Sequence, residues 1–179
     1  MINFIELGGV KYPIDTSFKT AILCDKINND PDIDDYDRPI IIVTLLLGIE
    51  APYTQEALDK CKLYLEGGDE LEGDEKRILD FTQHWDYFVG AFYQAYGLNL
   101  NEVDLHYYEF LSLLRSLKNT ALNDIVELLT YDLSEIKDKK TRDKIIKAQK
   151  KFKIKQVVKR PQEESAFLKS LSPSVKGVK

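Results

Sequence analysis

The stretch FTQHWDYFVGAFYQAYGLNLNEVDLHYYEFLSLLRSL, residues 81–117, decides the fold class of this chain. Its aromatic residues recur every three or four positions, at Phe81, Trp85, Phe88, Phe92 and Tyr96. This spacing places them on one face of an α-helix. The pattern predicts a helix from about residue 74 to residue 96, ended by Gly97.

Three further helices are predicted on the C-terminal side of this stretch. Asn101 is the expected cap of the first, whose apolar stripe comprises Leu105, Tyr108, Leu111 or Phe110, Leu114 and Leu117. A short helix follows over residues 120–129, and Ser134 is the expected cap of a polar helix that ends near Lys153.

The N-terminal part predicts a β-hairpin followed by three helices. Two β-prone runs flank Gly8-Gly9, which is typical of a tight hairpin turn. Thr16 or Ser17 should cap a helix ending near residue 27, with four apolar residues inward: Phe18, Ile22, Leu23 and Ile27. Pro39 suits the first turn of a second helix that ends at Gly48, although the β-branched run 40–43 also allows a buried strand. Thr54 is the expected cap of the third helix.

These elements predict a mainly α protein: a single helical domain with an N-terminal β-hairpin and a flexible C-terminal tail. The 179 residues suffice for one sizeable domain, and 44% of them are hydrophobic, enough for a real core. We expect a domain over residues 1–160, with the hairpin at about 2–14 and helices to about 153. Residues 161–179, rich in Ser, Pro, Lys and Gly, should form the tail.

The charge is unevenly distributed along the chain. The net charge is −5, which argues against a whole-surface nucleic-acid binder. Residues 137–160, however, hold twelve Lys or Arg and only Asp138 and Asp143 against them. An acidic body therefore carries a basic C-terminal segment.

Several features indicate a reducing cytoplasm rather than an exported or membrane location. The N-terminus lacks the basic region of a signal peptide, and the longest apolar run is too short to span a bilayer. Cys24 and Cys61 are the only cysteines and form no disulfide framework, so we expect two free thiols.

No catalytic or metal-binding motif stands out, so we expect a non-enzymatic protein without cofactor or metal. The run Asp30-x-Asp32-x-Asp34 resembles the start of a calcium loop, but the required glycine and glutamate positions hold other residues. His84 and His106 are expected to be hydrogen-bonded at the edges of packed helices. A small enzyme that uses these histidines and nearby carboxylates is the last-ranked alternative.

Two groups of residues are candidates for partner binding. The aromatic residues exceed what one small core can absorb, which predicts Tyr87, Tyr93, Tyr107 and Tyr108 at or near a partner or self-association surface. On the basic helix, Lys140, Lys144, Lys147 and Lys151 share one side with Lys137 at three- and four-residue spacing. A solvated helix face, an acidic partner and nucleic acid are all compatible with such a run.

The central pattern resembles a known family. It reads Asp86-x-Phe88-x-x-Ala91-Phe92-x-x-x-Tyr96-Gly97-Leu98-x-Leu100, then Leu105-His106-Tyr107-Tyr108-x-Phe110, with a shorter match at Ile125 to Tyr131. This resembles the siphophage tail assembly chaperone family of Gram-positive hosts, small Gp15-type proteins encoded upstream of the tape measure. The family tends to have paired tryptophans at Tyr107-Tyr108 and an arginine at Asp132.

The resemblance implies a non-enzymatic role in bacteriophage tail assembly and virion morphogenesis. It implies that the chain is a chaperone that binds the long, apolar, helical tape-measure protein until tube subunits enclose it. The tail-tube protein and further copies of the chain are additional expected partners, and the mature virion should lack the chaperone. The alternative is a nucleic-acid-binding phage regulator that uses the basic C-terminal helix.

Overall fold

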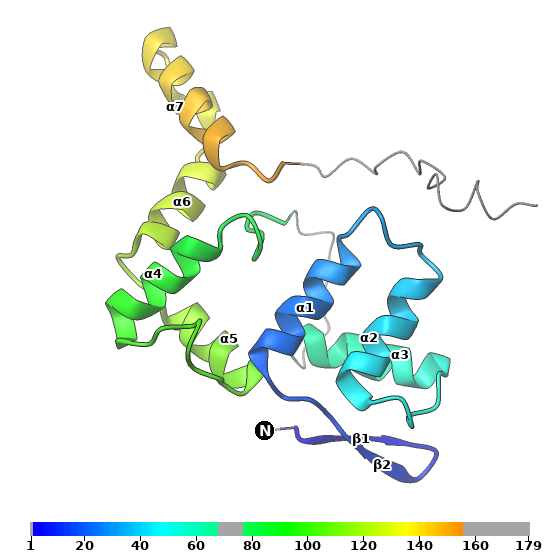
Figure 1. Cartoon of the computed structure of the whole chain (residues 1–179). Helices are drawn as coiled ribbons and strands as arrows, with labels where there is room; N and C mark the ends of the chain where they lie inside the picture. The colour runs from blue at the N-terminus through cyan, green and yellow to red at the C-terminus, as the bar shows by residue number, and fades with distance from the viewer. Residues whose placement is uncertain (1, 68–76, 156–179) are drawn as a thin grey trace, which may run out of the picture.

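The computed structural model describes residues 2–67 and 77–155, and the side chain of residue 135 is not described. In these residues an N-terminal hairpin is followed by seven α-helices, which confirms the mainly α fold (Figure 1). Figure 1 shows α1, α2 and α3 with the hairpin on one side of the molecule and α4, α5 and α6 on the other. The predicted tail lies outside the described residues.

The hairpin pairs β1 (Phe4–Leu7) with β2 (Val10–Pro13) in antiparallel register, as predicted. Gly8 and Gly9 both have positive φ, 55° and 82°, and glycine adopts this turn conformation without steric cost. Ile5 and Leu7 point inward and are buried against α3. A two-stranded hairpin is marginal alone, so this contact supplies its support.

Helices α1 (Phe18–Asn28), α2 (Asp37–Leu47) and α3 (Gln55–Leu65) begin and end close to the predicted positions. Ser17 and Thr54 cap α1 and α3 by accepting backbone N–H groups. The run 40–43 is helical, so the strand alternative is wrong.

The inward face of α1 differs from the prediction beyond Phe18. Leu23 is 42% exposed, and Ile22 and Ile27 are only partly buried, whereas Ala21 and Cys24 are buried. Because α1 packs against both α2 and α5, the small side chains fill its closest contacts.

The aromatic helix α4 (Trp85–Tyr96) is shorter than predicted at its start. The Asp80 carboxylate accepts the N–H groups of Thr82 and Gln83, and the Asp80 N–H donates to His84 Nδ1. These side-chain hydrogen bonds hold residues 80–84 in a turn, and such local bonds compete with a helix. At the other end Gly97 adopts the left-handed conformation, as predicted.

Helix α5 (Tyr107–Ser116) begins six residues after the predicted cap Asn101. The strand-like segment before it is tied to the start of α1: Phe18 N–H donates to Leu105 C=O at 3.0 Å, and Tyr107 N–H donates to Thr16 C=O at 2.7 Å. These long-range bonds pair residues 105–107 with residues 16–18, so α5 starts only at Tyr107 and His106 becomes its cap through its ring Nδ1.

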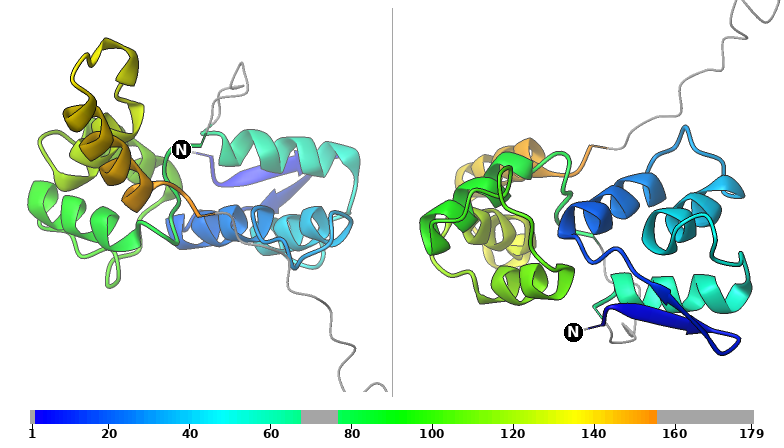
Figure 2. Two further views of the ribbon diagram at one scale, coloured as in Figure 1. Left: turned by 90° about the horizontal axis from the view of Figure 1, so that it is seen from above. Right: turned by 60° about the horizontal axis from the view of Figure 1, so that its bottom comes forward.

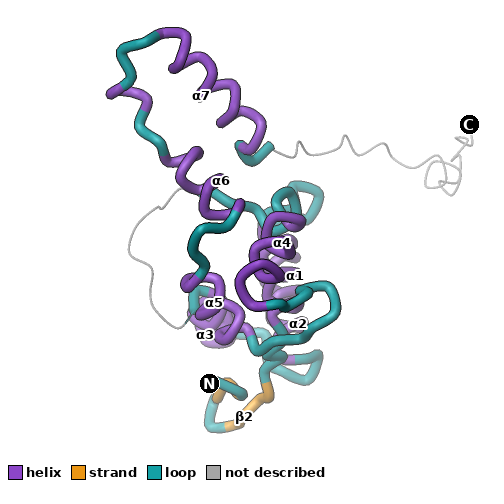
Figure 3. The backbone as a smooth tube through the Cα atoms, turned by 90° about the vertical axis from the view of Figure 1, so that its left-hand side faces the viewer, coloured by secondary structure: helices purple, strands orange, loops and turns teal. Residues whose placement is uncertain are grey.

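The C-terminal elements are α6 (Ala121–Thr130), a 3₁₀ turn (Leu133–Glu135) and α7 (Lys139–Phe152). The predicted helix over residues 120–129 is α6, and Thr120 caps it. Ser134 lies in the 3₁₀ turn, and Asp138 caps α7 instead, accepting the Thr141 N–H at 2.8 Å. Figure 3 shows α6 and α7 extending from the rest of the chain, and the two views of Figure 2 place α7 beside α4 and α6.

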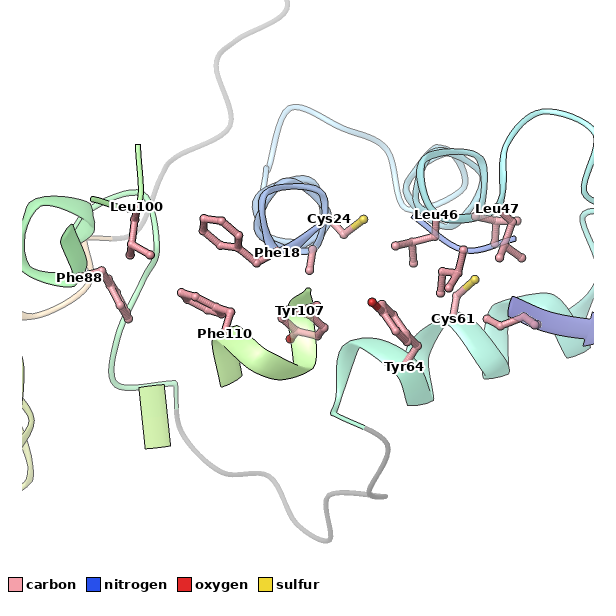
Figure 4. Close-up of a cluster of buried hydrophobic side chains, with 14 of the residues drawn as sticks. Phe18, Cys24, Leu46, Leu47, Cys61, Tyr64, Phe88, Leu100, Tyr107 and Phe110 are labelled. Carbon is pink, nitrogen blue, oxygen red and sulfur yellow. The ribbon is translucent and has the colours of Figure 1, made fainter. Parts of the chain in front are cut away.

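Stacked aromatic rings join the two halves of the molecule. Phe110 of α5 stacks on Phe18 of α1 with ring centroids 4.9 Å apart, and on Phe92 of α4 at 5.2 Å. Figure 4 shows the same core continuing through Tyr107 and Tyr64 towards Cys61 and Leu46. Such pairs contribute about 0.5–1.5 kcal/mol each beyond their buried area.

Candidate functional site

Helix α7 is the most exposed helix of the described chain, because none of its residues is buried. All seven of its Lys and Arg side chains are exposed, and they include the predicted Lys140, Lys144, Lys147 and Lys151. Within residues 2–67 and 77–155, none of these cations forms an ion pair with a carboxylate. We call this set of side chains the α7 basic face.

The other side of α7 carries its apolar residues. Ile145, Ile146, Ala148 and Phe152 are partly buried, and α7 packs against α6. Gln149 Nε2 donates to the carbonyls of Leu128 and Tyr131 at the end of α6, at 2.9 and 3.4 Å. The helix is therefore amphipathic: its apolar side packs against α6, and its basic face is exposed.

Two residues before α4 hold the C-terminal end of α7. His84 accepts the Asp80 N–H at Nδ1, so its ring proton is on Nε2, which donates to Phe152 C=O at 2.8 Å. Gln83 forms a reciprocal pair with Lys155, accepting its N–H at 2.9 Å and donating to its C=O at 3.0 Å. These bonds satisfy backbone groups at the end of α7.

The prediction that His84 and His106 are hydrogen-bonded at helix edges is confirmed. His84 is only 4% exposed and bridges the start of α4 to the end of α7. His106 accepts the Tyr108 N–H and lies 3.3 Å from Ile2 C=O. In the described part of the chain, no three His, Cys, Asp or Glu side chains converge as metal ligands would.

Replacing His84 by alanine should loosen α7. Both backbone partners of a buried ring would lose their hydrogen bonds, so we expect the free energy of unfolding to fall by about 2–3 kcal/mol. Hydrogen exchange should accelerate most in residues 139–155. The exposed neighbour change Thr82→Ala is the matched control, and equal exchange in both variants would contradict the bridging role.

The four predicted tyrosines do not form one surface. Tyr87 is partly buried and meets the edge of Phe152 at 5.8 Å, next to Lys151, so it adjoins the α7 basic face. Tyr93 is 65% exposed on α4. Tyr108 is partly buried and stacks on Tyr64 at 5.1 Å.

Tyr107 is a core residue, so its expected place at the surface is wrong. It is 8% exposed, and its hydroxyl donates to Leu65 C=O at 2.7 Å. Burial is also the main reason that its pKa is raised to about 12. A partner role remains a prediction for Tyr87, Tyr93 and Tyr108.

The two thiols are free, as predicted, and both are buried. Burial raises the pKa of Cys24 from 9.0 to about 12 and that of Cys61 from 9.0 to about 11. Reactive cysteines show the opposite shift, so these behave as small apolar side chains.

Stability should therefore fall at alkaline pH. Because the folded pKa values exceed the unfolded ones, the thiols' contribution is fully present below pH 9 and is lost as the pH rises towards 11–12. Between pH 9 and 10 the loss should be about 1 kcal/mol per thiol. The buried tyrosines Tyr64 and Tyr107, whose pKa values burial also raises, add a smaller loss as unfolded tyrosines ionise towards pH 10. Urea midpoints at pH 8, 9 and 10 test this. The Cys24→Ala/Cys61→Ala variant should show a flatter dependence, and an unchanged slope would contradict the assignment.

Comparison with known protein families shows to which family this chain belongs. Residues 1–154 match the sequence model of the family described as Bacteriophage Gp15 protein. The chain belongs to the bacteriophage Gp15 family. The match covers all seven helices of the described residues and ends just past α7, so the α7 basic face lies within the family region.

Membership in the Gp15 family indicates a phage structural or assembly role, and it does not favour the nucleic-acid-binding regulator. No curated protein and no solved structure matches the chain. In the described residues no helix has the length and apolar content needed to cross a membrane.

Proposed function

We propose that this Gp15 family member is a tail assembly chaperone that binds the tape-measure protein without catalysing a reaction. Family membership supports a role in phage structure or assembly. The resemblance of the central aromatic segment to tail assembly chaperones supports a role in the tail. The chaperone acts in the host cytoplasm and leaves before the virion is complete.

The observation that carries the proposal is the α7 basic face. Helix α7 extends from the rest of the chain and carries seven exposed Lys and Arg side chains. None of them pairs with a carboxylate within the described residues. Such a surface attracts an acidic segment of another polypeptide and speeds its encounter. Beside it, Tyr87 and Phe152 provide aromatic area of the kind that anchors protein interfaces.

This mode of binding suits a chaperone that binds its client reversibly. Exposed ion pairs contribute little each and are screened by salt, so several of them give moderate affinity that other subunits can displace. The client would be released by competition with tail-tube subunits, without a nucleotide.

Co-expression with the tape-measure gene of the same phage tests this proposal. The tagged chain should capture the tape-measure protein at low salt, and capture should weaken as salt is raised. If the chain bound mixed-sequence DNA and did not capture the tape-measure protein, the proposal would be wrong and the nucleic-acid-binding regulator would be favoured.

A further inference from the structure

A groove lies between α1, α2 and α3, on the half of the molecule that carries the hairpin. Its volume is about 610 Å³. Residues from both ends of α3, Gln55 and Leu65, line it. It therefore runs the length of that helix, about 16 Å for eleven residues. This elongated shape suits about three turns of a second helix.

The floor of the groove is apolar and comes from three helices. Ile42 of α2 and Leu58 and Leu65 of α3 are partly buried against the core, with the two thiols beneath them. An apolar floor with a polar edge is the form in which proteins bind amphipathic helices, which insert residues spaced three or four apart.

The rim of the groove is acidic. Asp25, Asp35, Asp59 and Glu66 line it, against the cations Arg38 and Lys62. Both cations are already engaged: Arg38 with Asp35, and Lys62 with Glu66 at 3.7 Å. Arg77, outside the lining, pairs with Asp25, which leaves Asp59 as the carboxylate that favours a basic occupant.

Asp25 is itself paired with Arg77, so Asp59 is the rim carboxylate without an ion pair within the described residues. Asp59 is exposed and accepts a hydrogen bond from Gln55 at 2.8 Å. Asp25 is partly buried beside Arg77, and its pKa is raised, mainly by burial, although Arg77 lowers it. A second cation beside Asp25 would offset the cost of burying its charge.

We propose that this groove binds an amphipathic α-helix of the client protein, with its apolar stripe on Ile42, Leu58 and Leu65 and with flanking Lys or Arg side chains facing Asp25 and Asp59. The inference rests on the proposed function, because it takes the partner to be a helical polypeptide. It adds a second binding surface of opposite charge to the α7 basic face.

Two synthetic peptides of fourteen residues serve as probes. Both carry leucines at helical spacing, and they differ only in having lysine or glutamate beside the leucine stripe. Fluorescence anisotropy with the full chain should show about tenfold tighter binding of the lysine peptide. Equal binding of both peptides, or binding of neither, would overturn the proposal.

Two charge variants of α3 locate the binding. Asp59→Lys changes the rim, whereas Glu56→Lys makes the same charge change on an exposed residue of the same helix outside the groove. Asp59→Lys should weaken the lysine peptide about tenfold and reverse the preference, and Glu56→Lys should leave it nearly unchanged. Equal effects of the two variants would contradict groove binding. Both substitutions are at exposed positions, so unfolding should not obscure the result.

The same variants separate this inference from the proposed function. If the unmodified chain captures the tape-measure protein and both variants capture it equally, the groove proposal fails and the chaperone function stands. If the unmodified chain captures nothing, the function itself fails. If Asp59→Lys instead abolishes self-association in sedimentation without affecting peptide binding, the groove belongs to a second copy, and the proposal is wrong.

Discussion

Replacing Phe110 by alanine should lower the free energy of unfolding by about 3–5 kcal/mol, the usual cost of removing a fully buried aromatic ring. Phe110 has no exposed surface and lies between the stacked rings of Phe18 and Phe92. The substitution would thus open a cavity where the two halves of the molecule meet. Because domains of this size typically have about 5–15 kcal/mol of stability, the loss is a large share of the total, and the variant should unfold at a clearly lower urea concentration.

Urea denaturation followed by circular dichroism measures this effect. Phe110→Leu should lose less, because it keeps most of the buried volume. Tyr93→Ala is the control, since Tyr93 is 65% exposed and its loss should change stability by no more than about 0.5 kcal/mol. If Phe110→Ala cost no more than Tyr93→Ala, the aromatic stack would not be what joins the two halves.

Reversing the charge of the α7 basic face should reduce affinity for the tape-measure protein about 100-fold. The variant replaces Lys140, Lys144, Lys147 and Lys151 by glutamate. Each change removes an attraction and adds a repulsion of similar size, so the four together have a large effect even at exposed sites. The fold should persist, because all four side chains are exposed and none pairs with a carboxylate within the described residues.

A variant of equal net charge provides the matched control. Lys11, Lys19, Lys26 and Lys118 are exposed lysines outside α7, and their replacement by glutamate changes the total charge equally. We expect this control to retain most of the affinity at 0.15 M salt, where distant charges are screened. Equal losses in both variants would show that net charge, and not the α7 basic face, determines binding.

The elements that the sequence predicts well are those specified by neighbouring residues. Ser17 and Thr54 are caps whose side chains bond backbone groups two or three positions away, and Gly97 ends α4 by its own conformation. Such short-range chemistry is readable from a local window. The exposure of the basic residues of α7 was predictable for the same reason, from their spacing and the scarcity of apolar neighbours.

The features that the sequence did not predict depend on contacts between distant residues. The start of α5 is set by pairing of residues 105–107 with residues 16–18, and the sequence around the predicted cap Asn101 does not indicate this pairing. The bridge from His84 to Phe152 spans 68 positions. The groove could not be predicted from the sequence because its floor combines residues of three different helices. Tyr107 is indistinguishable by type from Tyr108, and only the packing against α3 makes it a core residue.

The most direct test of the chaperone function is the aggregation of the tape-measure protein itself. Diluted from urea in the presence of an equimolar amount of this chain, the tape-measure protein should remain in solution, and its light scattering should stay near the buffer level. The charge-reversed α7 variant should protect it much less. Scattering that rises equally with and without the unmodified chain would contradict the account.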